Sequence, residues 1–87
     1  MTKKTQRNVL IRTITHYYVG TAVAENDRWI TLDNASWIAD TGRFSAVFEK
    51  GFDNNAEIER LPDGTQINVQ NIIDVIPFSQ TLPTKTQ

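Results

Sequence analysis

Few residues in this chain have the side chains that catalysis requires. The chain has no Cys, a single histidine (His16) and no Gly-rich loop of the kind that cradles phosphates. One triplet, Asp40-Thr41-Gly42, is of a catalytic type. In an aspartate dyad, two subunits each contribute one such Asp and the pair shares a proton. A dimeric hydrolase is therefore the one enzymatic hypothesis to weigh against the rest of the sequence.

The residues around the triplet disfavour that hypothesis. Retropepsin-type aspartic proteases, which the triplet resembles, follow it with a small residue, whereas this chain has Arg43. They also need a Gly-rich flap and a second apolar-apolar-Gly element, and no Gly follows Gly64. Asp40 or Thr41 can instead cap a helix. We expect no enzymatic activity and no cofactor, and a single His without Cys cannot assemble a Cys/His metal site.

The length of 87 residues indicates one domain with a small core. Such a chain buries only about 60–65% of the surface that its unfolded form exposes. Small domains commonly gain extra stability from disulfides or bound metals, and neither is expected here. Association with further copies of the chain is the remaining common source of stability. No apolar run approaches the roughly 20 residues of a membrane span, and no secretory start is present. We expect a cytoplasmic protein.

The formal net charge of −1 conceals an uneven distribution. Lys3, Lys4 and Arg7 lie in the first seven residues and Lys85 in the last three. The other five basic residues stand against all ten acidic ones, which gives the middle of the chain a net charge of about −5. Such a core does not bind nucleic acid by bulk phosphate attraction. Any nucleic-acid contact must therefore be local.

Polar ends enclose a single domain. Residues 1–8 are expected to be a flexible basic N-terminal tail and residues 79–87 a flexible C-terminal tail, since Leu82 is their only core-forming residue. The domain spans 9–78.

The first part of the domain has a β pattern. Residues 9–35 are rich in β-branched and aromatic side chains, with a turn signal at Asn26-Asp27-Arg28, and this predicts three strands. Gly20 inside the run predicts a sharp bend or bulge.

An insertion follows at about 36–63. Phe44, Val47 and Phe48 have helical spacing and Gly51 is placed as a C-terminal stop, which predicts a short helix of two turns.

The chain then returns to strands. A tight turn at 62–64 is predicted between a strand near Glu57–Leu61 and another from Thr65. The apolar alternation of this last part stops at Gln70 and Asn71 and then resumes. The sequence thus divides one β run into two short strands.

Two motifs in this order resemble the Sm-like (LSm/Hfq) family. The first matches at Gly20, at a loop over Glu25–Trp29 and at Leu32-Asp33-Asn34-Ala35. The second, two short strands joined by a sharp turn, matches over Asn68–Pro77. Residues in register with the Hfq form are Ile72, Val75, Ile76 and Pro77.

The chain departs from the family at several points. Arg28-Trp29 stand where the family has Met-Asn, Gln70 and Asn71 replace its usual turn residues, and the insertion is extra. This combination is similar to divergent Sm-like proteins of phage and marine metagenomic origin, for which the location is the host cell cytoplasm.

The resemblance implies an all-β fold: a strongly bent five-stranded Sm-like (SH3-like) small barrel with one short inserted helix. In the family the edge strand before the turn pairs with the edge strand after it on the next subunit, so the resemblance implies a homo-oligomeric ring of roughly five to seven subunits. It also implies binding of RNA or single-stranded DNA in RNA/DNA processing, without catalysis.

The implied nucleotide sites are the turns that repeat around the pore. There an aromatic ring or planar cation stacks on a base while Asn or Gln hydrogen-bonds its edge. The candidate nucleic-acid-binding residues are Asn26, Arg28, Trp29, Gln70 and Asn71. Repetition around a ring compensates for weak single contacts.

Each candidate also has a structural interpretation. Trp29 suits core or subunit-interface packing, Gln70 and Asn71 suit a polar turn, and His16 suits a strand surface. The basic N-terminal tail is either solvated or in contact with phosphate. The second hypothesis for the whole chain is a structural or adaptor ring, for example of a phage, that binds protein and no nucleic acid.

Overall fold

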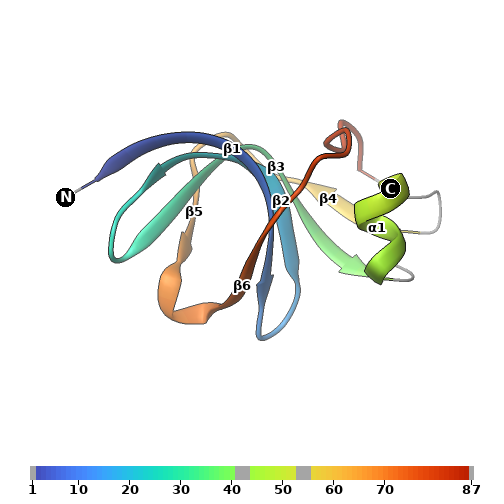
Figure 1. The fold of residues 1–87 in the computed structure, drawn as a ribbon, viewed down its shortest axis with the longest axis horizontal. Coiled ribbons are helices and arrows are strands. Elements are labelled where there is room, and N and C mark those ends of the chain that lie inside the picture. Colours follow the sequence, from blue (N-terminus) through green and yellow to red (C-terminus); the bar gives the residue numbers. More distant parts are fainter. Residues whose placement is uncertain (1, 41–43, 53–55, 87) are drawn as a thin grey trace.

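The computed structural model describes residues 2–40, 44–52 and 56–86 as an antiparallel sheet with one short helix (Figure 1). The elements in chain order are β1 (Lys3–Thr13), β2 (Tyr17–Glu25), β3 (Trp29–Asp40), α1 (Phe44–Lys50), β4 (Glu57–Arg60), β5 (Thr65–Asn68), the 3-10 turn η1 (Val69–Asn71) and β6 (Ile72–Pro77). The side chain of Asp40 and residues 41–43 lie outside this description. The catalytic-type triplet and the helix cap therefore stay predictions.

The strands follow the order β4-β3-β2-β1-β6, and β5 pairs with β3 beside this path. The 12-residue β3 serves two partners on one side, β5 along its first half and β4 along its second. The expected all-β class with one short inserted helix is confirmed, and the bent sheet is barrel-like. The sheet has six strands rather than five, because 57–60 also pairs with β3, and it is not closed.

A bend in the middle of β3 makes this double pairing possible. The register between β2 and β3 shifts between Val19 and Thr21, opposite Asn34, whose φ of 49° is in the left-handed region. A Cβ on Gly20 would lie only 3.0 Å from the Cα of Ala35. The bulge predicted at Gly20 is confirmed, because only a residue without a side chain allows the two backbones to approach this closely.

Hydrogen bonds from polar side chains connect the bend of β3 to the turn that joins β4 to β5. The backbone N–H of Asn34 donates to Oδ1 of Asp63 (2.8 Å), and the N–H of Gly64 donates to Oδ1 of Asp33 (3.0 Å). Arg60 donates from Nη2 to Oδ1 of Asn34 (2.6 Å). The position of β5 is therefore fixed relative to the bend of β3.

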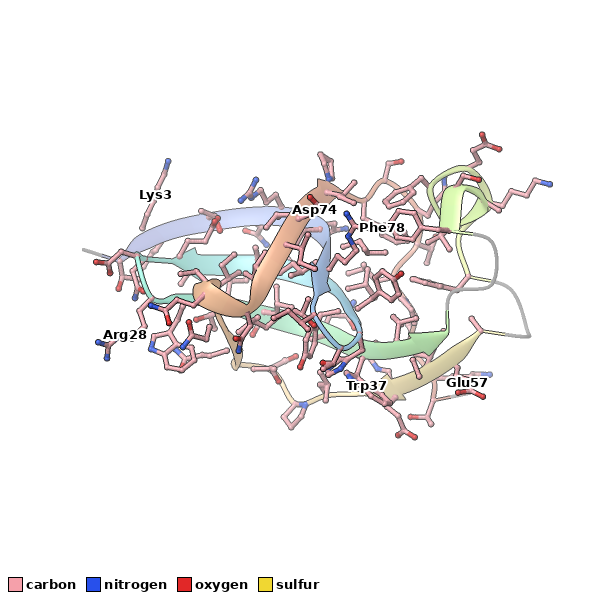
Figure 2. All side chains as sticks on the ribbon, turned by 90° about the horizontal axis from the view of Figure 1, so that it is seen from below. Lys3, Arg28, Trp37, Glu57, Asp74 and Phe78 are labelled. Carbon is pink, nitrogen blue, oxygen red and sulfur yellow. The ribbon has the colours of Figure 1, made fainter. Side chains whose placement is uncertain are left out.

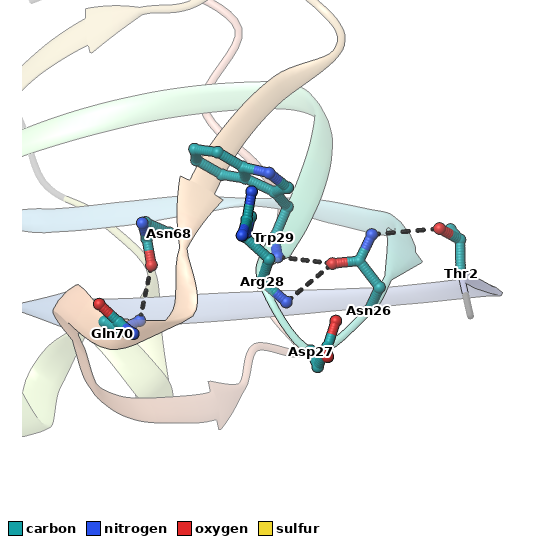
Figure 3. A pocket seen from close by; sticks show the side chains of 7 residues that line it. All are labelled: Thr2, Asn26, Asp27, Arg28, Trp29, Asn68 and Gln70. Carbon is teal, nitrogen blue, oxygen red and sulfur yellow. Dashed lines mark hydrogen bonds between the residues drawn. The ribbon is translucent and has the colours of Figure 1, made fainter.

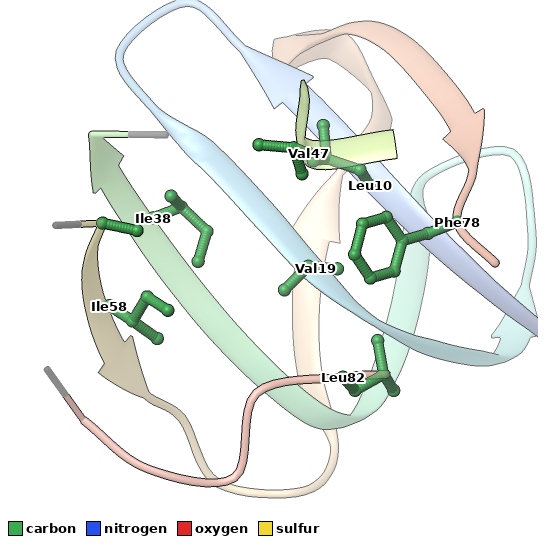
Figure 4. Close-up of a cluster of buried hydrophobic side chains, with 8 residues drawn as sticks. Leu10, Val19, Ile38, Val47, Ile58, Phe78 and Leu82 are labelled. Carbon is green, nitrogen blue, oxygen red and sulfur yellow. The ribbon is translucent and has the colours of Figure 1, made fainter. Parts of the chain in front are cut away.

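The bent sheet encloses two hydrophobic clusters. Because side chains alternate along β1, Val9 and Ile11 enter one cluster and Leu10 the other. The cluster under the helix contains Leu10, Val19, Ile38, Val47, Ala56, Ile58, Phe78 and Leu82 (Figure 4). The other contains Val9, Ile11, Ala22, Ile30, Leu32, Ala35 and Ile67. The insertion thus adds a second core to the domain.

The predicted helix is confirmed at Phe44–Lys50. Gly51 ends it with a φ of 77°, and its N–H donates to the carbonyl of Val47 (2.9 Å). This left-handed C-terminal cap is the one that the sequence indicated. Val47 is buried in the cluster beneath, while Phe44 and Phe48 pack at its margin.

The N-terminal segment differs from the expected flexible tail. β1 begins at Lys3 and pairs with β2 as far as Lys3 opposite Glu25. Oγ1 of Thr5 donates to the carbonyl of Ala22 (2.9 Å), and Arg7 forms an ion pair with Glu25 (2.9 Å). The first part of this strand, residues 3–8, was not detectable in the sequence because most of its side chains are exposed and no apolar alternation marks it.

The C-terminal segment also differs from a free tail, although residues 79–86 form no helix or strand. Leu82 is buried, and Arg60 donates from Nη1 to the carbonyl of Pro83 (2.7 Å). Gln80 donates to the carbonyl of Phe48 (3.1 Å). Hydrogen bonds from side chains hold this segment against the domain, and a periodicity search does not detect such contacts.

The close approach at Gly20 gives a stability prediction. Gly20→Ala should lower the free energy of unfolding by about 1–3 kcal/mol, because the new methyl group meets the backbone of β3 rather than a movable side chain. Urea denaturation followed by circular dichroism measures this change. Ala35→Gly should relieve part of the cost in a double-mutant cycle, since the Cβ of Ala35 lies 3.2 Å from the added atom. An unchanged urea midpoint in the single variant would contradict the prediction.

Candidate nucleic-acid interface

A polar depression lies where the β2–β3 turn meets the turn between β5 and β6 (Figure 3). Its volume is about 690 Å³, and it is open to solvent. The lining residues are Thr2, Asn26, Asp27, Arg28, Trp29, Asn68 and Gln70. Four of the five predicted site residues therefore meet in one place.

Strand pairing brings these two turns together. Trp29, the first residue of β3, lies opposite Asn68, the last residue of β5. The N–H of Val69 donates to the carbonyl of Arg28 (2.9 Å), which extends the ladder by one step. The site is thus anchored to the sheet, and its position follows from the pairing of β5 with β3.

Asn26 builds the β2–β3 turn from within. Its Oδ1 accepts hydrogen bonds from the N–H groups of Arg28 and Trp29, both at 2.8 Å. Its Nδ2 donates to Oγ1 of Thr2 (3.1 Å). Both polar ends of the side chain are thereby occupied inside the protein. Asn26 holds Trp29 and Arg28 in place, and its predicted contact with a base, for which Nδ2 has a second N–H, stays a prediction.

On the other side of the depression, Oδ1 of Asn68 accepts from the N–H of Gln70 (2.9 Å) and shapes η1. The side chain of Gln70 is exposed at the depression. Asn71, the fifth predicted residue, lies outside the depression. It lines a second groove of about 590 Å³, which also includes Trp29, Ile14 and Tyr18.

Three residues of the depression are not among the residues predicted from the sequence: Asp27, Asn68 and Thr2. Asp27 stands between two residues that were chosen, so its place in the turn was a usable signal. Thr2 was not detectable, because it reaches the depression only through the unexpected N-terminal strand.

The depression is electrically balanced. Asp27 and Arg28 are both exposed, and neither side chain forms an ion pair or hydrogen bond with the described residues. Lys3 lies at the same end of the molecule as Arg28 (Figure 2) and lines an adjoining hollow with Arg7. Arg7 is paired with Glu25, whereas Lys3 makes no ion pair with the described residues and can meet a phosphate.

His16 lies outside the polar depression, at the β1–β2 turn. Its ring nitrogens are within hydrogen-bond distance of Oγ1 of Thr15 (2.6 Å) and the hydroxyl of Tyr18 (2.9 Å). Its ring packs edge-on against Trp37, with centroids 4.8 Å apart. Partial burial lowers the pKa of His16 from its usual value. These contacts give His16 a structural role within a small aromatic cluster.

No three His, Asp or Glu side chains of 2–40, 44–52 and 56–86 lie close enough to hold a metal ion. No helix in these same ranges is long and apolar enough to cross a membrane.

The bonds of Asn26 give a prediction about the turn. Asn26→Ala should release Trp29 from its fixed position and lower the free energy of unfolding by about 1 kcal/mol, because two backbone N–H groups lose their acceptor. Asn26→Asp keeps an acceptor oxygen and should largely preserve the turn. The fluorescence anisotropy decay of Trp29, measured with Trp37 replaced by Phe, reports its mobility. Equal mobility in the Ala and Asp variants would show that the turn does not depend on Oδ1.

Comparisons of the chain with protein-family models, with curated proteins and with solved structures found no match. The Sm-like assignment and the nucleic-acid role therefore remain predictions at this point.

Proposed function

We propose that this chain binds single-stranded nucleic acid, RNA or DNA, without catalysis, as an Sm-like homo-oligomeric ring in the cytoplasm. One observation carries the proposal. A tryptophan, a guanidinium group and an amide with unused hydrogen-bonding capacity converge on one open depression from two turns far apart in the sequence. Trp29 offers a stacking surface, and Arg28 and Gln70 offer planar groups that hydrogen-bond to base edges.

The charge of the molecule favours base contacts over phosphate contacts. Asp27 offsets Arg28 at the depression, and the middle of the chain carries about five excess negative charges. A duplex presents phosphates and hides the faces of its bases, so it gains little from such a surface. An unstacked strand offers those faces to Trp29.

Free strand edges support the ring. β5 pairs only with β3, and β6 pairs only with β1, so each has an open edge in the described chain. The free edge of β4 is different: the N–H of Arg60 donates to Oγ1 of Thr86 in the C-terminal segment (3.2 Å). Pairing of β6 with β5 of the next copy would satisfy both open edges and repeat the polar depression around a ring.

A specific surface feature favours the second candidate, a structural or adaptor ring that binds protein. Ile14 is 77% exposed and borders the second groove beside Tyr18. An exposed aliphatic side chain at a groove can bury apolar surface against a protein partner, whereas it adds nothing to contacts with phosphates or base edges. The two candidates predict different results for nucleic acid that copurifies with the protein, read as the ratio of absorbance at about 260 and 280 nm.

The first prediction here concerns stacking. Trp29→Ala should weaken binding of a fluorescent single strand by about 1–3 kcal/mol per stacked base, because the aromatic surface is lost. Trp37→Ala is the matched control, since Trp37 packs on His16 away from the depression and should leave affinity unchanged. Anisotropy titrations at moderate salt measure both. Equal losses for the two variants would locate the site elsewhere or point to general unfolding.

The second prediction concerns assembly. Ile73→Asp should dissociate the proposed ring while the subunit stays folded, because Ile73 is already 55% exposed and lies on β6, whose outer edge is unpaired in the described chain. Native mass spectrometry and circular dichroism measure the two effects. Ile14→Asp, in the β1–β2 turn, controls for the loss of an exposed apolar side chain. Dissociation by Ile14→Asp alone would contradict assembly through the edge of β6.

A further inference from the structure

The polar depression contains two opposite charges, on Asp27 and Arg28, that form no ion pair with the described residues. The Oδ1 atoms of Asn26 and Asn68 already accept hydrogen bonds from backbone N–H groups. The carboxylate of Asp27 and the guanidinium of Arg28 have no hydrogen bond or ion pair to the described residues. A ligand that enters therefore meets one group that only accepts hydrogen bonds and one that only donates them.

Among the standard bases, guanine matches this pair of groups. Its Watson–Crick edge presents two adjacent donors, N1–H and N2–H₂, which suit the two oxygens of one carboxylate. Its O6 and N7 are two adjacent acceptors, which suit the fork of a guanidinium. Adenine alternates a donor with acceptors on both edges, and cytosine and uracil lack the N7 side altogether. None of the three satisfies Asp27 through both oxygens.

Asp27 disfavours the binding of a strand that places a base other than guanine in the depression. A carboxylate beside a bound nucleotide repels the phosphates and is not compensated by a base that offers it no donors. Two donors on the same base edge offset that repulsion through charge-assisted hydrogen bonds. Asp27 therefore acts against non-guanine bases as well as for guanine.

From these groups we infer that the depression is selective for guanine, with Asp27 accepting from the Watson–Crick edge, Arg28 donating to O6 and N7, and Trp29 stacking on the base. This inference depends on the proposed function and adds base preference to it. A guanine base reaches the site from a single strand or from a free guanine nucleotide. Repetition around a ring favours the strand, because several weak sites then act together.

The experiment compares uridine heptamers that carry one central substitution. Guanosine should bind about tenfold more tightly than adenosine at that position. Inosine, which lacks the N2 amino group but keeps N1–H, should lose one of the two hydrogen bonds to Asp27. Likewise, 7-deazaguanosine, which lacks N7 but keeps O6, should lose one of the two hydrogen bonds from Arg28. Heptamers with a single guanosine avoid quadruplex formation. Guanosine monophosphate is titrated separately as the free nucleotide.

Asp27→Asn should abolish the difference between guanosine and inosine while all-uridine strands bind equally well or slightly better, since one negative charge is removed. A merely structural role of Asp27 would weaken every strand alike. Glu57→Gln is the charge-matched control, because Glu57 is exposed at the opposite end of the molecule from Arg28 (Figure 2). It should leave the preference for guanosine intact.

The outcomes separate this inference from the proposed function. If no heptamer binds, the proposed function fails and the base preference fails with it. If heptamers bind through Trp29 but guanosine gives no advantage, or Asp27→Asn leaves its advantage intact, the inference is overturned and the proposed function stands. Binding of guanosine monophosphate as tight as that of the heptamer would overturn the strand as the natural source.

Discussion

The structure depends on the bend of β3 opposite Gly20. Because β3 changes direction at Asn34, its first half pairs with β5 and its second half with β4, and one strand thereby organises two cores. The cost of a left-handed non-Gly residue is met by side-chain hydrogen bonds from Arg60 and to Asp63. Without the bend, β3 could not pair with β4 and β5 along its two halves, and β5 would not lie beside the β2–β3 turn.

The site follows from the same constraint. Trp29 begins the half of β3 that pairs with β5, so the register that places Asn68 opposite Trp29 also places η1 beside the β2–β3 turn. The side chains around the polar depression then divide into two groups. Asn26 and Asn68 form the turns, and Asp27, Arg28 and Gln70 stay available to a ligand. Polar residues of similar type therefore have different roles: some stabilise the turns, and others are available to a ligand.

The sequence was informative where a pattern has a local physical cause. Gly20 predicted the bulge and Gly51 the end of the helix, because both need backbone that other residues rarely adopt. That the β2–β3 turn and η1 lie together was predicted only through the resemblance to the Sm-like motifs. Pairing of the polar segment Lys3–Asn8 with β2 was missed, since its stabilisation comes from backbone bonds rather than from burial. The different roles of Asn26, which forms the turn, and Asp27, which faces the depression, could not be predicted, because both residue types suit a turn equally well.

Electrostatics connects the fold to the proposed role. Cations that would attract phosphate non-specifically are few in the middle of the chain, and two of them, Arg12 and Arg60, are held by Asp74 and by the bend of β3. The binding free energy available to a nucleic acid must therefore come from base faces and edges. Such contacts distinguish bases, whereas phosphate contacts do not. In the proposed ring, a small acidic domain of this kind would gain affinity by repeating one selective contact, and its low cation content would leave strands that carry the wrong base weakly bound.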